Sequence, residues 1–143
     1  MQKKSLNSSQ NNWNKYPYTG SLDRFVDCVR QLDPVLVLLF GSVAKGDFTQ
    51  YSDADVLVVF EQPVVWEKVY ACSNGVVQPV VKTLPDLLSK IKAGEPFYCE
   101  MISEGKILIN KKLTMERLTQ ALEDTQQHLG LERTASGWRW GKK

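Results

Sequence analysis

Residues 40–60 read FGSVAKGDFTQYSDADVLVVF, and this stretch decides the fold. The apolar run 35–40 leads into its Gly-Ser turn, and the apolar run 56–60 follows its Asp-x-Asp pair. Apolar runs this short and this uniform are typical of strands buried on both faces. The sequence therefore predicts two core strands, and the segment that joins them carries both polar motifs.

The Asp-x-Asp pair consists of Asp53 and Asp55. In a strand these two side chains project from the same face, whereas Ala54 points the other way. Two neighbouring carboxylates repel each other unless a cation lies between them, and hard oxygen ligands favour Mg²⁺ or Mn²⁺. Because Mg²⁺ is commonly held by one or two carboxylates together with substrate phosphates, the pair predicts a nucleotide as well as a metal. Taken alone, most such pairs are solvated surface or cap residues.

The Gly-Ser turn supplies groups that suit a phosphate. Gly41 lets the backbone approach an anion closely, and Ser42 offers a hydroxyl and an amide where a turn or helix begins. Lys45 adds a positive charge. Gly-Ser turns are common in proteins that bind nothing, so the specific signal is their combination with the aspartates on one short connection.

This combination resembles the Gly-Ser and Asp-x-Asp signature of the nucleotidyltransferase superfamily typified by DNA polymerase β. The small size resembles the minimal nucleotidyltransferases of archaea and bacteria. The resemblance is specific over residues 35–60 and extends in layout to residue 109. It implies an α+β fold of the α/β-like kind, with a mixed sheet of about four strands flanked by helices.

The resemblance also implies a reaction and its site. Gly41 and Ser42, with Lys45, would bind the phosphates of a nucleoside triphosphate, while Asp53 and Asp55 would be catalytic and hold Mg²⁺ or Mn²⁺. The implied reaction moves a nucleoside monophosphate, AMP from ATP by family habit, to an acceptor hydroxyl and releases pyrophosphate. Minimal members act with a helical partner protein of the HEPN kind, which they adenylylate as part of a toxin-antitoxin pair.

Two departures from the family pattern open an alternative. Relatives carry Arg after the Gly-Ser turn, where this chain has only Lys45, and they place a third carboxylate on a following strand, where it has Gln78. A neutral amide neither supplies charge nor accepts a proton. Glu61, Asp86 or Glu100 could substitute. The alternative is a weakly active or inactive, antitoxin-like module that binds a nucleotide or a partner.

Length and composition predict a single soluble domain. The chain has 143 residues, of which 43% are hydrophobic and 24% charged, and no apolar run approaches the ~20 residues of a membrane span. Both ends are basic although the net charge is only +2, so the body between them is acidic. Nucleic acid is therefore not an expected partner of the body. Homo-oligomerisation is left open.

The chain divides into a flexible arm (1–20), a nucleotidyltransferase domain (21–131) and a basic, aromatic tail (132–143). The arm is polar and lacks the apolar core of a secretory signal. In the tail, Trp138 and Trp140 alternate with a cation, which would suit either base stacking or packing onto the domain or a partner.

The three cysteines, Cys28, Cys72 and Cys99, are far apart in sequence and form no CxxC pair. They are interpreted as reduced thiols of a cytoplasmic protein. A zinc site formed with His128, the only histidine, is disfavoured because no two of these ligands are close in sequence.

Periodicity and turn residues predict alternating helices and strands. A helix is expected from an N-cap at Ser21 to residue 32. Pro79 is expected either to put its strand at a sheet edge or to mark a bulge in that strand. The other expected elements are strands at 35–40, 56–60, 76–82 and 106–109, a helix or turn at 42–52, and helices at 64–70, 84–92, 96–103 and 113–129.

Overall fold

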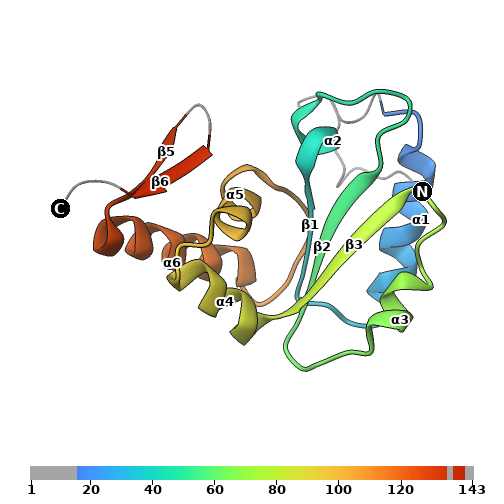
Figure 1. Ribbon diagram of the computed structural model, residues 1–143. Helices are drawn as coiled ribbons and strands as arrows, with labels where there is room; N and C mark the ends of the chain where they lie inside the picture. The colour runs from blue at the N-terminus through green and yellow to red at the C-terminus, as the bar shows by residue number, and fades with distance from the viewer. Residues whose placement is uncertain (1–15, 135–136, 141–143) are drawn as a thin grey trace.

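The computed structural model describes residues 16–134 and 137–140, in which strands and helices alternate along the chain (Figure 1). The elements are α1 (Thr19–Arg30), β1 (Leu36–Phe40), α2 (Gly41–Lys45), β2 (Ala54–Phe60), α3 (Trp66–Tyr70), β3 (Val77–Thr83), α4 (Leu84–Lys92), α5 (Pro96–Glu104), β4 (Lys106–Asn110), α6 (Thr114–Leu129), β5 (Leu131–Thr134) and β6 (Gly137–Trp140).

Four strands form a mixed sheet in the order β3-β2-β1-β4. Strand β1 runs antiparallel to both of its neighbours, whereas β2 and β3 are parallel. The predicted α+β fold with a mixed sheet is confirmed. Strand β3 is an edge strand, the first of the two alternatives that Pro79 predicted. Proline has no backbone N–H to donate, and at an edge that position needs no neighbouring strand.

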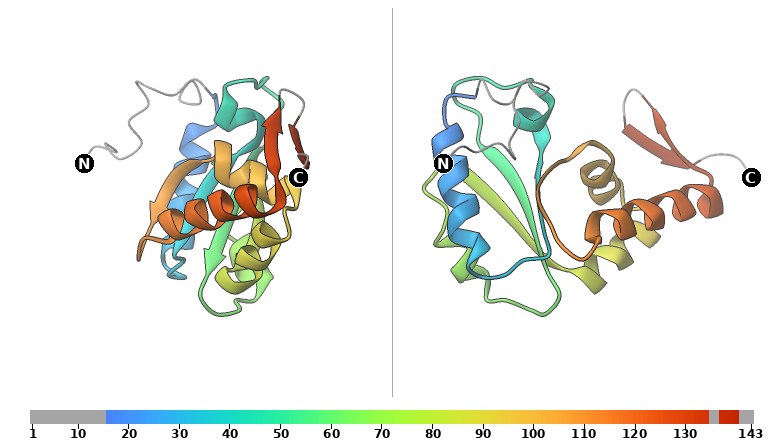
Figure 2. Two further views of the ribbon diagram at one scale, coloured as in Figure 1. Left: turned by 90° about the vertical axis from the view of Figure 1, so that its left-hand side faces the viewer. Right: turned by 180° about the vertical axis from the view of Figure 1, so that it is seen from behind.

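Helices cover both faces of the sheet (Figure 2). Helices α1 and α3 lie on one face, and α4, α5 and α6 lie on the other (Figure 1). A hydrophobic core lies on each face of the sheet, and alternate residues of β1 belong to the two cores. Val37 and Leu39 pack toward α1, and Leu36 and Leu38 pack toward α4, α5 and α6. This division explains why the central strands are apolar throughout.

The first helix begins before the residue expected to cap it. Helix α1 starts at Thr19, so Ser21 lies inside it, where its Oγ accepts a hydrogen bond from Arg24 Nη2 at 3.1 Å. Tyr16 is only 2% exposed and belongs to the core. The expected boundary between arm and domain at residue 21 therefore falls within packed structure, and residues 1–15 of the arm lie outside the described residues.

The expected tail contains a β-hairpin. Strands β5 and β6 pair antiparallel, with Arg133 opposite Trp138. Leu131 is buried and Trp138 packs against the core beneath α4, α5 and α6. The hairpin is thus part of the domain. The sequence left two roles open for the tail, base stacking or packing, and Trp138 packs onto the domain. Residues 135–136 and 141–143 lie outside the described part of the chain.

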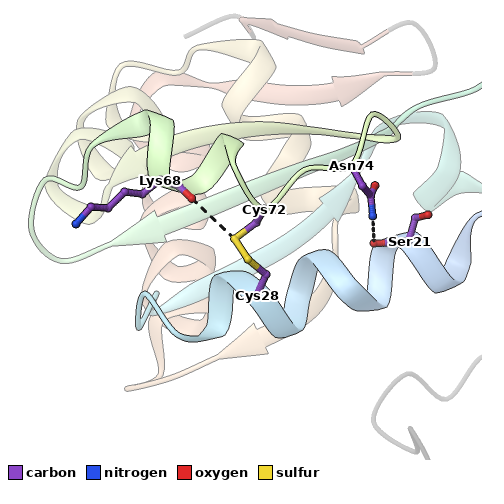
Figure 3. The surroundings of a disulfide bond; sticks show 5 residues. All are labelled: Ser21, Cys28, Lys68, Cys72 and Asn74. Carbon is purple, nitrogen blue, oxygen red and sulfur yellow. Dashed lines mark hydrogen bonds between the residues drawn. A yellow bond between two sulfur atoms is a disulfide. The ribbon is translucent and has the colours of Figure 1, made fainter.

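The interpretation of all three cysteines as reduced thiols is wrong for two of them. Cys28 on α1 and Cys72, just after α3, form a disulfide (Figure 3). Both lie on the same side of the sheet, with their Cα atoms 5.6 Å apart, although 44 residues separate them in sequence. Their spacing carried no signal because the fold alone brings them together. The cysteine argument for a cytoplasmic location therefore loses its basis, and the location stays a prediction.

The third cysteine fits its interpretation. Cys99 is free and buried, and burial raises its pKa to about 11, so the thiol stays protonated at neutral pH. Within residues 16–134 and 137–140, no three His, Cys, Asp or Glu side chains gather in a way that could hold a metal ion.

Helix length can be compared with the thickness of a bilayer. In the described part of the chain, none of the helices combines the length and the apolar character that crossing a membrane requires.

Candidate functional site

The two motifs of the central segment meet at one end of the sheet. Strand β1 ends where β2 begins, and Phe40 pairs with Asp55 across the two antiparallel strands. Asp55 is partly buried, whereas Asp53 lies just before β2 and is exposed. The register of β1 and β2 therefore places the turn after Phe40 beside the two aspartates.

Gly41 lies close to the carboxylate of Asp55, so a larger residue there would have to displace it. A Cβ atom at Gly41 would lie 2.6 Å from Asp55 Oδ2, and the backbone there has φ of +79°, a conformation that favours glycine. Ser42 follows in α2, whose end is marked by Gly46 in a left-handed conformation. The structure thus brings together Gly41 and Asp55, two of the residues singled out by sequence.

The environment of Asp55 favours a bound cation. Burial raises the pKa of the Asp55 carboxyl, and the nearby charge of Asp53 raises it further. Both effects disfavour the ionised form, and a divalent ion held by these oxygens would relieve both of them. The donor set, carboxylate oxygens beside a close backbone turn, fits a hard cation such as Mg²⁺.

Tyr16 supports this site and was missed by the sequence argument, which placed it in the flexible arm. Its hydroxyl donates to the backbone carbonyl of Ser52, the residue before Asp53. Its ring packs edge-on against Phe48 at 5.4 Å between centroids. Burial, followed by the charge of Asp53, raises its pKa. The available signal was an aromatic residue three positions before the start of α1.

Gln78 lies where the sequence argument expected a third carboxylate. In the parallel pairing of β2 and β3 it is directly opposite Asp55, so its side chain projects from the same face of the sheet. It contributes an amide, and among the described residues no third acidic, histidine or cysteine side chain completes a metal-binding group with the aspartates.

Two of the three possible substitutes lie at the opposite end of the sheet. Glu61 follows the last residue of β2 and pairs with Lys112 at 2.9 Å. Asp86 lies in the first turn of α4, after β3 has ended, and pairs with Lys82 at 3.4 Å. Because β2 and β3 are parallel, both positions are a full strand length away from Asp53.

The third possible substitute, Glu100 on α5, does reach the candidate site, through Lys45. Its Oε2 lies 3.2 Å from Lys45 Nζ. Arg133 approaches Glu100 Oε1 at 3.1 Å, and the Trp138 indole donates to the same oxygen at 3.1 Å. Glu100 is therefore engaged by two cations and an indole, and Lys45 is ion-paired.

Comparisons with known proteins identify the family to which the chain belongs. The family described as "nucleotidyltransferase domain" matches residues 22–109, which include every predicted site residue. The chain therefore belongs to the nucleotidyltransferase domain family, and the resemblance to minimal nucleotidyltransferases of the polymerase β superfamily is confirmed.

A protein sequence and a solved structure are also similar to parts of this chain. A Methanocaldococcus jannaschii protein, provisionally named a protein adenylyltransferase, is 32% identical over 76 residues, which cover 50% of this chain and 75% of that protein. A crystal structure of a provisionally assigned nucleotidyltransferase from Sulfolobus solfataricus is 23% identical, covers 58% of this chain and 77% of its own, and gives a TM-score of 0.39.

Proposed function

We propose that this protein is a Mg²⁺-dependent nucleotidyltransferase that moves AMP from ATP to an acceptor hydroxyl on a partner protein, as in toxin-antitoxin pairs with a helical HEPN-type partner. The observation that carries the proposal is the contact of the Gly41 backbone with the Asp55 carboxylate. That contact puts a turn suited to phosphate directly beside a pair of carboxylates suited to metal. The name of the M. jannaschii relative supports adenylyl transfer to protein.

Each residue of the site has a role in this proposal. Asp53 and Asp55 would hold Mg²⁺, or Mn²⁺, which prefers the same oxygen ligands. Metal ions bound in such sites stabilise the attacking and leaving oxygens of an in-line displacement. Gly41 and Ser42 would bind the phosphates with a backbone amide and a hydroxyl. Lys45 would add one positive charge to the phosphate oxygens, without the two-pronged geometry of an arginine.

Gln78 limits the chemistry that this site would perform. The acceptor hydroxyl has to lose its proton as its oxygen bonds to the α-phosphorus and pyrophosphate leaves. An amide opposite Asp55 can position a water but cannot accept that proton. This observation favours the second candidate function, in which the same site binds a nucleotide, or the protein binds a partner, with weak or no catalysis.

Pyrophosphate release separates the two functions. The purified protein is incubated with ATP, Mg²⁺ and a candidate acceptor, first of all the protein encoded next to it. The transferase releases pyrophosphate and modifies the acceptor, and Asp53→Asn abolishes both. The Gln78→Asp variant, which supplies the missing carboxylate, should release pyrophosphate faster than the wild type.

Two results would decide against the proposal. Binding of ATP without pyrophosphate release from the wild type or from Gln78→Asp would favour the binding module. An unchanged melting temperature on addition of ATP and Mg²⁺, together with no release, would exclude both functions at this site.

A further inference from the structure

Glu100 is the point at which the phosphate-side helix α2, helix α5 and the C-terminal hairpin meet. Lys45 reaches it from α2, Arg133 from β5 and Trp138 from β6. Arg133 also pairs with Glu104, one turn further along α5. The hairpin is therefore connected to the segment that carries Gly41 and Ser42 through a single carboxylate.

The partners of Glu100 differ in how firmly they hold it. The Arg133 guanidinium contacts both carboxylate oxygens, with Nη1 3.1 Å from Oε1 and Nη2 3.2 Å from Oε2. This two-pronged, end-on geometry is stronger than a single contact, and the indole of Trp138 adds a third hydrogen bond. Lys45 makes one contact with Glu100, and its side chain is 43% exposed. The Lys45–Glu100 ion pair therefore contributes little to holding the Glu100 carboxylate in place.

Lys45 can consequently leave Glu100 without leaving a charge unpaired. Glu100, whose side chain is 29% exposed, would keep the arginine and the indole. Lys45 would gain a phosphate oxygen in exchange. The exchange conserves the number of charge pairs at Lys45 and needs only a rotation of a flexible side chain.

We infer that Glu100 is a positioning residue that competes with nucleotide phosphate for Lys45, and that the C-terminal hairpin sets the strength of this competition by fixing the Glu100 carboxylate. The inference rests on the proposed function, because it assumes that phosphate binds beside α2. It assigns the hairpin a role in nucleotide affinity in addition to its role in packing.

The test is the affinity for Mg²⁺·ATP at low ionic strength, measured by calorimetry. Glu100→Gln keeps the size of the side chain and an oxygen for the Trp138 indole but removes the charge that holds Lys45. It should bind Mg²⁺·ATP about two- to fivefold more tightly than the wild type, the range that an exposed ion pair allows. Glu104→Gln is the matched control. It also removes a carboxylate of α5 that pairs with Arg133, and it should leave the affinity unchanged.

A second comparison shows whether the effect passes through Lys45. Lys45→Met should weaken binding, and adding Glu100→Gln to it should change nothing further. Damage to the fold would weaken binding instead of tightening it, and melting temperatures of all variants detect such damage.

Three outcomes would overturn the inference. The first is that Glu100→Gln binds no more tightly than Glu104→Gln, and the second is that its gain persists in the Lys45→Met background. In both cases the proposed function stands while the inference fails. A wild-type protein that binds no Mg²⁺·ATP would overturn the inference and the proposed function together.

Discussion

At the scale of single residues, the site depends on how closely Gly41 and Asp55 approach each other. The left-handed backbone at Gly41 and the short distance to the carboxylate are separate requirements. Glycine meets both without backbone strain and without displacing the carboxylate, so the Gly of the Gly-Ser motif is explained by geometry as well as by family membership.

Gly41→Ala tests this explanation against Gly75→Ala. Gly75 has a similar φ, +88°, but open space around it, so it experiences the backbone strain alone. We expect Gly75→Ala to lower the free energy of unfolding by about 1–2 kcal/mol, the cost of a left-handed alanine. Gly41→Ala should lower it further and also abolish Mg²⁺·ATP binding. Chemical denaturation measures the first effect and calorimetry the second, and equal losses of stability in the two variants would contradict the close contact.

The raised pKa of Asp55 predicts a pH-dependent loss of stability in metal-free protein. Its folded-state pKa lies above the unfolded value because of burial and the charge of Asp53. Below the unfolded pKa the group is protonated in both states and there is no penalty. The charged form of Asp55 is disfavoured in the folded state but not in the unfolded state. The protein therefore loses stability as the pH rises through the folded pKa.

Asp55→Asn removes this titration. Compared by urea denaturation in a metal chelator, Asp55→Asn should gain stability relative to the wild type between about pH 4, the ordinary value of an aspartate, and neutral pH. Added Mg²⁺ should stabilise the wild type and leave the variant unaffected. A stability difference that stays constant over this pH range would contradict the assigned environment.

The main motifs could thus be predicted from the sequence, but the residues that surround them in the fold could not. The sequence predicted Gly41, Ser42, Asp53 and Asp55 as neighbours because all four lie on one strand-to-strand connection. Tyr16 was missed, since its contact with Ser52 joins residues 36 positions apart. The sequence also could not show which of the three acidic side chains approaches the site. Glu61 and Asp86 are placed at the opposite end of the sheet by the parallel register of β2 and β3, which is a property of the fold.

At the scale of elements, helices and strands with clear end signals were predicted best. Helix α4 covers the predicted 84–92, where Thr83 Oγ1 accepts from the Asp86 amide and a proline lies in the first turn. The sequence argument interprets the hairpin β5–β6 as a tail, because a basic, aromatic composition is found in extended tails as well as in hairpins. Its strands are only four residues each, and pairing with each other and packing on α5 determine their structure.

The disulfide joins two elements and predicts a measurable gain in stability. It ties α1 to the turn between α3 and β3, where Asn74 Nδ2 also donates to the carbonyl of Ser21 at 3.4 Å (Figure 3). For the 44-residue separation, loop-closure entropy corresponds to about 4 kcal/mol. Cys28→Ser should lower the free energy of unfolding by roughly this amount or somewhat less.

Reduction provides the control for this prediction. Dithiothreitol should lower the stability of the wild type to that of Cys28→Ser and should have no effect on the variant. Denaturation curves of the wild type that coincide with and without dithiothreitol would show that the bond contributes nothing.

At the scale of the whole molecule, the three layers explain where the site lies. Helices cover the core strands on both faces (Figure 2), so chemistry is confined to the ends of the sheet. The N-terminal ends of β2 and β3 carry Asp55 and Gln78. Helices α2 and α5 border this end and meet through Lys45 and Glu100. The hairpin contacts α5 through Glu100, and the same carboxylate contacts Lys45, so the hairpin lies near the candidate site.

The measurement that tests the central claim most directly compares ATP labelled on its α-phosphate with ATP labelled on its γ-phosphate. With Mg²⁺ and an acceptor protein, a nucleotidyltransferase moves the α-label to the acceptor and leaves the γ-label in pyrophosphate. We predict α-label on the acceptor with the wild type and none with Asp55→Asn. Transfer of the γ-label instead, or equal α-labelling by Asp55→Asn, would contradict the account.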